Sequence, residues 1–233
     1  MASWLKRLQV GVVDFFFPRQ CVGCGKVGDF ICVSCSKHLH RLILPLCQKC
    51  GKPEPSGVYC PECWKKQSSV DVIRSVFIFE GTIRSAVHAL KYQNLYAISG
   101  CLGELMARYY KEYGLTGDFL LPVPLHEKRT RDRGYNQSEL LAREISKIIH
   151  VPVKQRLITR VKDTKPQART SVAEERRKNV DSAFLCKNNE VAGKNIVVID
   201  DVCTSGATLE ACATALKTAG AKHITGFTLA REI

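Results

Sequence analysis

Eight cysteines gathered in the first third of the chain restrict its fold more than any other feature of the sequence. They form four CxxC pairs: Cys21/Cys24, Cys32/Cys35, Cys47/Cys50 and Cys60/Cys63. A CxxC turn directs two thiolates at one ion, and two such turns complete a tetrahedral four-sulfur site that is typical of structural zinc. Residues 20–66 are too few to bury a stabilising core by themselves, so we expect metal binding to hold this segment together. Four thiolates leave no open coordination position, and the predicted metal is therefore structural rather than catalytic.

The spacing of the pairs predicts two sites formed in sequence order. Seven residues separate the first two pairs, nine separate the last two, and eleven lie between the two halves. The shorter gaps suit a zinc knuckle or ribbon. The predicted sites are Cys21, Cys24, Cys32 and Cys35 for the first ion, and Cys47, Cys50, Cys60 and Cys63 for the second. An interleaved cross-brace would use the same eight residues in different pairs, and the sequence leaves this alternative open.

The rest of the sequence favours reduced thiols over disulfide bonds. Disulfide frameworks are typical of small secreted chains that carry a signal peptide. Here Lys6 and Arg7 precede an apolar stretch that Asp14 interrupts, and no small-residue cleavage site follows. No apolar run approaches the ~20 residues that cross a bilayer. We therefore expect a cytoplasmic protein without an integral membrane segment, in which the four other cysteines are incidental thiols.

Positive charge is concentrated in two parts of the chain. The formal net charge is +13, and residues 1–66 carry ten basic and four acidic side chains, while residues 126–178 carry fifteen and seven. Such a local excess predicts a surface for an anion, either a nucleic acid or a phosphorylated small molecule. A solvated surface without a ligand is the alternative for either patch.

Three segments follow from the pattern along the chain. Residues 1–19 predict an N-terminal helix that Pro18 ends, packed on its own domain or, alternatively, lying on a membrane surface. Residues 20–66 are the double zinc-binding segment, and residues 70–233 alternate strands with helices, which predicts a mostly parallel sheet covered on both faces. The predicted strands are Val76–Phe79, Phe119–Pro122, Ile196–Ile199 and His223–Leu229, and the predicted helices are Thr82–Lys91, Gly100–Tyr113, Ser138–Ile149 and Ala207–Ala219.

The run VVIDDVCTSGATL, from Val197 to Leu209, predicts a ligand site. A hydrophobic strand brings Asp200 and Asp201 to the carboxyl end of the sheet, and a Thr-Ser-Gly-x-Thr turn then opens a helix. Backbone N–H groups and hydroxyls at a helix N-terminus suit a phosphate. The two carboxylates are placed to accept hydrogen bonds from sugar hydroxyls, or to reach a divalent metal through water, so the implied ligand is a sugar phosphate. An ordinary N-capped helix would explain the hydroxyls but not the paired acids.

This run resembles the signature with which type I phosphoribosyltransferases bind phosphoribosyl diphosphate (PRPP). With LPVPLH at 121–126, RGYNQ at 133–137 and the CxxC-rich head, the chain resembles the ComF family of competence proteins from Pro18 to Arg231. That family joins a zinc-binding N-terminal segment to a phosphoribosyltransferase-type domain. The resemblance therefore implies a type I phosphoribosyltransferase-like α/β fold, with a mostly parallel sheet flanked by helices and a small N-terminal zinc ribbon or knuckle segment.

The resemblance also implies roles for individual residues around PRPP and Mg²⁺. Asp200 and Asp201 match the ribose-binding acids of the catalytic centre. The 5′-phosphate cradle matches Thr204, Ser205, Gly206 and Thr208, and the pyrophosphate loop matches Val123, Pro124 and Leu125. Arg129, Arg131 and Arg133 lie where a mobile basic loop would fold over the diphosphate, and Lys91 is expected near it.

The family resemblance implies a protein that handles incoming single-stranded DNA in the cytoplasm during natural transformation, with a DNA helicase as partner. The basic segment 126–178 and the zinc-binding segment would follow the phosphate backbone, with Tyr135, Tyr59 or Trp64 as stacking faces. The alternative is an active phosphoribosyltransferase that transfers ribose 5-phosphate from PRPP to an unidentified nucleophile. A zinc head that serves only to dock other proteins is a third interpretation.

Overall fold

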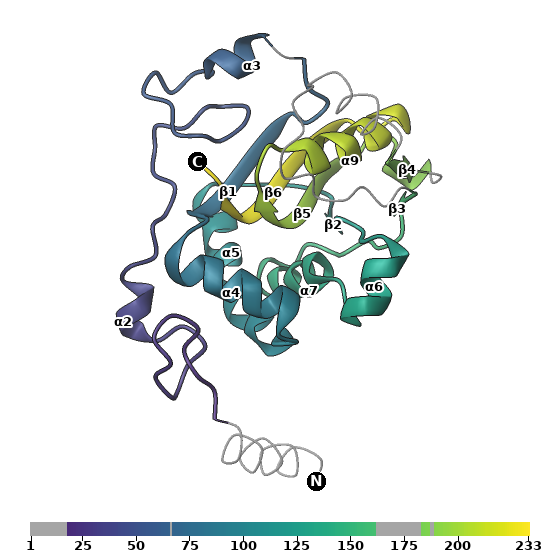
Figure 1. Cartoon of the computed structure of the whole chain (residues 1–233). Helices are drawn as coiled ribbons and strands as arrows, with labels where there is room; N and C mark the ends of the chain where they lie inside the picture. The colour runs from purple at the N-terminus through teal and green to yellow at the C-terminus, as the bar shows by residue number, and fades with distance from the viewer. Residues whose placement is uncertain (1–17, 66, 162–182, 187–188) are drawn as a thin grey trace, which may run out of the picture.

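The computed structural model describes residues 18–65, 67–161, 183–186 and 189–233. The predicted N-terminal helix lies outside these residues apart from its last two positions, and so does the end of the basic segment, residues 162–178. Within the described part, the zinc-binding segment runs along one side of an α/β domain (Figure 1).

Four parallel strands form the central sheet. In spatial order they are β1 (Val72–Ile78), β6 (His223–Arg231), β5 (Asn195–Cys203) and β2 (Phe119–Pro122). β5 and β6 lie in the middle and are buried along most of their length, as expected for strands covered on both faces. β2 is shorter and pairs with β5 only as far as Pro122 opposite Ile199, so the last residues of β5 continue beyond this neighbour.

Helices cover both faces of the sheet, as the alternating pattern predicts. One face carries α4 (Gly81–Tyr92), α5 (Ser99–Glu112) and α7 (Gln137–Ile149); the other carries α9 (Ala207–Thr218) and an antiparallel ribbon of β3 (Ile158–Arg160) and β4 (Phe184–Cys186) (Figure 1). Shorter elements are α2 (Val33–Ser36), α3 (Pro61–Lys65), η1 (Tyr96–Ile98), α6 (Glu127–Arg133) and η2 (Asn189–Val191). Each predicted strand and helix of the α/β domain is present, with ends that differ by up to four residues.

The zinc-binding segment is fastened to the free edge of the sheet. The amide of Leu42 donates to the carbonyl of Val76 at 3.0 Å, and the amide of Ile78 donates to the carbonyl of His40 at 2.8 Å. These bonds satisfy part of the outer edge of β1, which would otherwise expose unpaired backbone groups. The connection between the two cysteine clusters therefore belongs structurally to the α/β domain.

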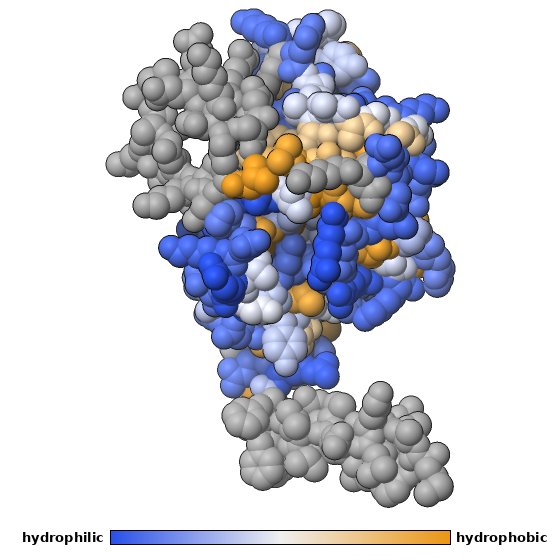
Figure 2. Space-filling view, turned by 90° about the vertical axis from the view of Figure 1, so that its right-hand side faces the viewer, coloured by the Kyte–Doolittle hydropathy of each residue, from blue (hydrophilic) through white to orange (hydrophobic). Residues whose placement is uncertain are grey.

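The side of the molecule that carries α6, β3 and β4 is largely hydrophilic, with apolar residues gathered across its upper middle (Figure 2). α6, whose sequence EKRTRDR is almost entirely charged, contributes to this hydrophilic surface.

Candidate sugar phosphate site and zinc centres

The structure groups the eight paired cysteines in sequence order. Within each tetrad the four sulfur atoms lie within 4.8 Å of one another: Cys21, Cys24, Cys32 and Cys35 form the first, and Cys47, Cys50, Cys60 and Cys63 form the second. This is the sequential arrangement and not the cross-brace. Four sulfurs converging on one point match the ligand set of structural zinc, so the two tetrads indicate two structural zinc ions.

The two tetrads are built by the same backbone pattern. The amide of Cys32 donates to Sγ of Cys21 at 3.4 Å, and the amide of Cys60 donates to Sγ of Cys47 at the same distance. Burial raises the pKa of Cys21, but these and neighbouring amide donors outweigh it and lower the pKa to about 6; Cys47 behaves alike. The side chain of Cys21 raises the pKa of Cys35, and burial raises the pKa of Cys50 and Cys63. Amide groups directed at sulfur favour thiolates, which are the form that binds zinc.

Asp200 and Asp201 lie where β5 runs past the end of β2. Asp201 is buried, and its Oδ1 is 2.7 Å from Nζ of Lys91 in the last turn of α4. Its Oδ2 is also buried and has no hydrogen-bond partner among the described residues. Because a buried carboxylate oxygen without a partner is costly, this atom fits a ligand hydroxyl or a hydrated cation.

Asp200 lies beside Asp201 and faces α7. Its Oδ1 accepts hydrogen bonds of 2.9 Å from Oγ of Ser138 and from the amide of Asp201. Burial and the negative charge of Asp201 raise the pKa of Asp200 to about 7, although Lys91 opposes this shift. The pair therefore carries less negative charge near neutral pH than two exposed carboxylates would.

The loop after β5 leads into α9 through Gly206. This residue has φ of +79° and precedes the first residue of the helix, a conformation that glycine adopts without strain. Thr204 and Ser205 are exposed, Thr208 is half-buried, and Oγ of Ser205 accepts a hydrogen bond from the amide of Ala207 at 3.4 Å. Hydroxyls and free N–H groups thus meet at the N-terminus of a twelve-residue helix, which suits a phosphate.

The segment Val123–Leu125 lies next to the same carboxylates. The amide of Val123 donates to the carbonyl of Ile199 at 2.9 Å, immediately before Asp200 in β5. Nδ2 of Asn136 donates to the carbonyl of Val123, and Oδ1 of Asn136 caps α7 by accepting from the amide of Ser138. The structure therefore brings the predicted pyrophosphate segment, the two acids and the start of α7 together.

The basic stretch after this segment is a helix and not the predicted mobile loop. Arg129, Arg131 and Arg133 all lie on α6, which His126 caps by accepting from the amide of Lys128 and which ends at Gly134, where φ is +78°. A histidine cap, an acid in the first turn and arginines before a glycine are helix signals that the sequence analysis overlooked. Arg133 bonds to Gln137, and its guanidinium lies 5.6 Å from the ring centre of Tyr92.

Of the three predicted stacking aromatics, one is committed to the fold. The hydroxyl of Tyr135 donates to the carbonyl of Leu90, and its ring is half-buried. Trp64 is 67% exposed and lies edge-on to Tyr59, with ring centres 5.4 Å apart. The structure therefore leaves Tyr59 and Trp64 accessible on the second knuckle.

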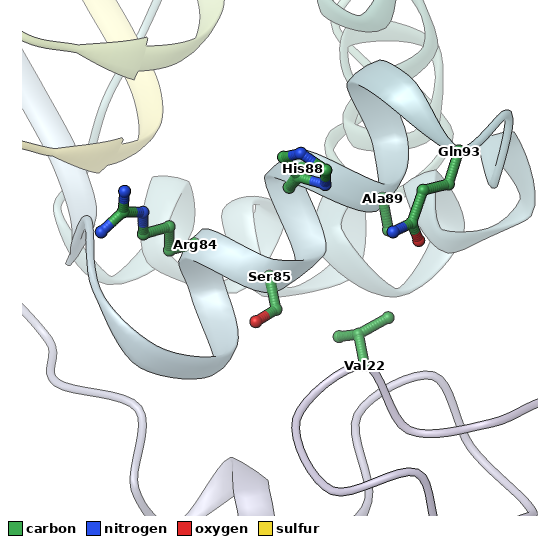
Figure 3. Close-up of a pocket in the computed structure, with 6 residues that line it drawn as sticks. All are labelled: Val22, Arg84, Ser85, His88, Ala89 and Gln93. Carbon is green, nitrogen blue, oxygen red and sulfur yellow. The ribbon is translucent and has the colours of Figure 1, made fainter.

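A second feature that the sequence analysis missed lies on α4. A pocket of about 350 Å³ separates this helix from the first knuckle, and it is lined by Val22, Arg84, Ser85, His88, Ala89 and Gln93 (Figure 3). In the close-up, Ser85 and Gln93 extend toward the loop that carries Val22. The spacing of Arg84, His88 and Tyr92, four residues apart on a helix, was the available signal.

Family models match two parts of the chain. A double zinc ribbon domain matches residues 12–64, and a phosphoribosyl transferase domain matches residues 135–232. These matches agree with the two cysteine tetrads and with the mostly parallel sheet flanked by helices.

Similar proteins cover almost the whole chain. Competence protein F from Haemophilus influenzae is 29% identical over 230 residues, which are 93% of this chain and 98% of that one. DNA utilization protein YhgH from Escherichia coli O157:H7 is 31% identical over 209 residues, which are 87% of this chain and 91% of that one. The chain belongs to the ComF family.

A solved structure is similar to part of this ComF protein. Glutamine PRPP amidotransferase from Bacillus subtilis, complexed with ADP and GMP, matches 57% of this chain and 26% of that one, with 19% identity and a TM-score of 0.40.

The helices of the described residues include none with the length and apolar character that a membrane span requires.

Proposed function

We propose that this ComF protein binds PRPP, or a related sugar phosphate, together with Mg²⁺ at the carboxyl end of β5. The environment of Asp201 carries the proposal: one carboxylate oxygen is held by Lys91, the other is buried without a partner, and a phosphate-type loop follows in the chain. A ribose hydroxyl donating to Oδ2 of Asp201 would remove the cost of this orphaned acceptor.

Each part of the site has a role in this proposal. Asp200 and Asp201 accept hydrogen bonds from the ribose hydroxyls, and Thr204, Ser205, Gly206 and Thr208 hold the 5′-phosphate at the N-terminus of α9. The backbone of Val123, Pro124 and Leu125 faces the diphosphate, with Lys91, Arg129 and Arg133 as the nearby cations. Mg²⁺ bound with the ligand would offset the charge of the diphosphate.

Calorimetric titration with PRPP and Mg²⁺ tests this proposal. We expect saturable binding to the wild-type chain and a loss of affinity of about tenfold or more in Asp201→Asn, because a charged hydrogen-bond acceptor is removed. Asp29→Asn is the matched control, since Asp29 is an exposed acid of the first knuckle. Absence of PRPP binding to the wild-type chain would contradict the proposal.

A second proposed function is binding of single-stranded DNA along the exposed face of α4. Arg84, His88 and Tyr92 are all exposed and form one stripe on this helix, which contains no acidic residue. The rings of His88 and Tyr92 lie 5.0 Å apart. Aromatic faces beside cations are what sequence-independent binding of single strands uses.

The stripe on α4 lies beside both the pocket at the first knuckle and the sugar phosphate site. Arg84 and His88 line the pocket beside the first knuckle, and Tyr92 follows Lys91, whose ammonium contacts Asp201 in the sugar phosphate site. Arg133 adds a cation beside Tyr92, which is 67% exposed despite this contact. A strand lying here would pass the sugar phosphate site, and its bases would stack on exposed rings.

Fluorescence anisotropy with a labelled thymidine oligonucleotide tests the DNA proposal. We expect binding to the wild-type chain to weaken by about tenfold or more between roughly 50 and 200 mM salt. Arg84→Ala with Tyr92→Ala should weaken it further, whereas Arg108→Ala should not, because Arg108 is an exposed cation of α5 that is paired with Glu104. A helicase partner stays a prediction of the family resemblance.

One observation favours the alternative of an active phosphoribosyltransferase. The pKa of Asp200 is raised to about 7, which is the range in which a carboxyl group exchanges protons efficiently near neutral pH. Diphosphate release from PRPP with a panel of bases and amines tests this activity. Release that disappears in Asp200→Asn while PRPP still binds would support it, and no release across the panel, with PRPP binding intact, would contradict it.

A further inference from the structure

Arg231, the last residue of β6, is a buried guanidinium that donates to the second zinc knuckle. Only 2% of the residue is exposed. Its Nη1 donates a 2.5 Å hydrogen bond to the carbonyl oxygen of Cys50, and its Nε is buried without a hydrogen-bond partner in the described chain. The nearby acid Glu62 is exposed and is paired with Lys52.

A buried cation needs a compensating negative charge nearby. The ion pairs of the described residues give Arg231 no carboxylate partner. Four thiolates around one Zn²⁺ leave a net charge of about −2 on the centre. Arg231 donates to the carbonyl of Cys50, a residue of this tetrad, so zinc thiolates there would reduce the cost of burying the guanidinium.

The same arginine lies beside the start of the phosphate-type loop. Arg231 and Cys203 are register partners in β6 and β5, and the amide of Glu232 donates to the carbonyl of Cys203 at 3.1 Å. Sγ of Cys203 in turn lies below Gly206, 3.9 Å from the position of a Cβ added there. The loop after Cys203 is thus held by the end of β6, whose last residue, Arg231, contacts the second knuckle.

The second knuckle also contacts β1. The amide of Ile73 donates to the carbonyl of Lys49 at 2.7 Å, and a Cβ added to Gly51 would lie 2.5 Å from the carbonyl oxygen of Ile73. The side chain of Ile73 extends to the loop between β5 and α9: its Cδ1 lies 3.5 Å from a Cβ added to Gly206. The second knuckle therefore contacts both Ile73 and Arg231, on the two strands that lie beside the loop.

We propose that Arg231 is the counter-ion of the second zinc centre and that it positions the loop Thr204–Thr208 for the ligand phosphate. This inference rests on the proposed sugar phosphate site. It assigns different roles to the two tetrads: the second holds the strands that support the loop, whereas the first packs against α4. Arg231 is a positioning residue in this scheme, because its guanidinium contacts the knuckle and not the ligand.

Two readouts on the full-length chain test the proposal. Arg231→Met keeps the length of the side chain but removes its charge, and we expect one of the two zinc ions to leave for a chromogenic chelator about tenfold faster or more. Affinity for PRPP with Mg²⁺ should fall by a similar factor. Arg231→Lys keeps the charge and should retain zinc better than Arg231→Met. Arg108→Met is the control, because Arg108 is an exposed arginine of α5 that pairs with Glu104 on its own helix; its zinc release and PRPP affinity should match wild type.

A pair of tetrad variants tests the coupling without altering Arg231. Cys63→Ser should weaken PRPP binding, and Cys24→Ser should leave it unchanged. Wild-type zinc release in Arg231→Met would overturn the counter-ion role, and faster release with unchanged PRPP affinity would overturn the positioning role. If the wild-type chain binds no PRPP, the proposed function fails and so does the positioning role, but zinc release still decides the counter-ion role.

Discussion

Nζ of Lys91 lies 2.7 Å from Oδ1 of Asp201, which joins the last turn of α4 to the carboxyl end of β5. The ammonium group of Lys91 therefore lies between the candidate site, with its two carboxylates, and the exposed stripe of α4 (Arg84, His88 and Tyr92). It also neutralises a carboxylate that is almost completely buried. We therefore expect stability and ligand binding to depend on the same pair.

Lys91→Met should destabilise the protein and alter the site together. Removal of the ammonium leaves the Asp201 carboxylate buried without its partner, which costs about 2–4 kcal/mol of unfolding free energy. The pKa of Asp200 should rise further, because Lys91 is the nearby charge that lowers it. Urea unfolding measures the first effect. The double variant Lys91→Met/Asp201→Asn should recover part of the loss, and an unchanged midpoint in the single variant would contradict this role of the pair.

The contacts of Asp71 predict how the stability of the fold changes with pH. The carboxylate accepts from the amide of Ile224 at 2.7 Å, lies 2.8 Å from Nζ of Lys217 and faces His223 at 3.6 Å. Although burial raises the pKa of Asp71, Lys217 and the amide of Ile224 outweigh burial and lower it. A carboxyl whose pKa is lower in the folded state stabilises the fold above its unfolded pKa of about 4, and this contribution is lost as pH falls through the folded pKa.

Asp71→Asn should therefore lower stability at neutral pH by about 1 kcal/mol and flatten its decline in acid. Thermal unfolding followed by circular dichroism from pH 7 to pH 3 measures both effects. If the wild-type and variant curves stay parallel throughout, Asp71 does not provide the acid sensitivity that its contacts imply.

Gly103 and Gly100 form a matched pair on α5. A Cβ added to Gly103 would lie 2.4 Å from Cβ of Glu144 in α7, whereas one added to Gly100 would meet nothing within 4 Å. Gly103→Ala should cost about 1–3 kcal/mol by forcing the two helices apart. Gly100→Ala should be neutral or stabilising by up to about 1 kcal/mol, because alanine favours a helix. Equal effects on the unfolding midpoint would show that close helix packing does not explain the glycine at 103.

Local sequence patterns predicted the parts of this protein that a short motif encodes. The CxxC spacing predicted both tetrads, and the hydrophobic run before Asp200 and Asp201 predicted a buried strand whose end carries two acids. These features depend on residues that are close together in the chain, so the local sequence is sufficient to predict them. The family resemblance added Lys91 near this site; no pattern around Lys91 indicates that its ammonium meets Asp201, because strand order and helix packing create that contact.

Other parts needed the tertiary structure or a closer reading of helix ends. The family resemblance implies a mobile loop for the arginines after Leu125, although His126 and Gly134 mark the ends of a helix. The burial of Arg231 follows from the knuckle packed over it, and the preceding strand pattern gives no sign of it. Its position opposite Cys203 depends on how β5 and β6 pair.

A crystal structure of the full-length chain grown with PRPP and Mg²⁺ tests the central claim most directly. The account predicts the 5′-phosphate against Thr204–Thr208, the ribose hydroxyls within hydrogen-bond distance of Asp200 and Asp201, and a partner on Oδ2 of Asp201. PRPP bound away from these carboxylates, or a loop at 204–208 that leaves the phosphate without contacts, would contradict it.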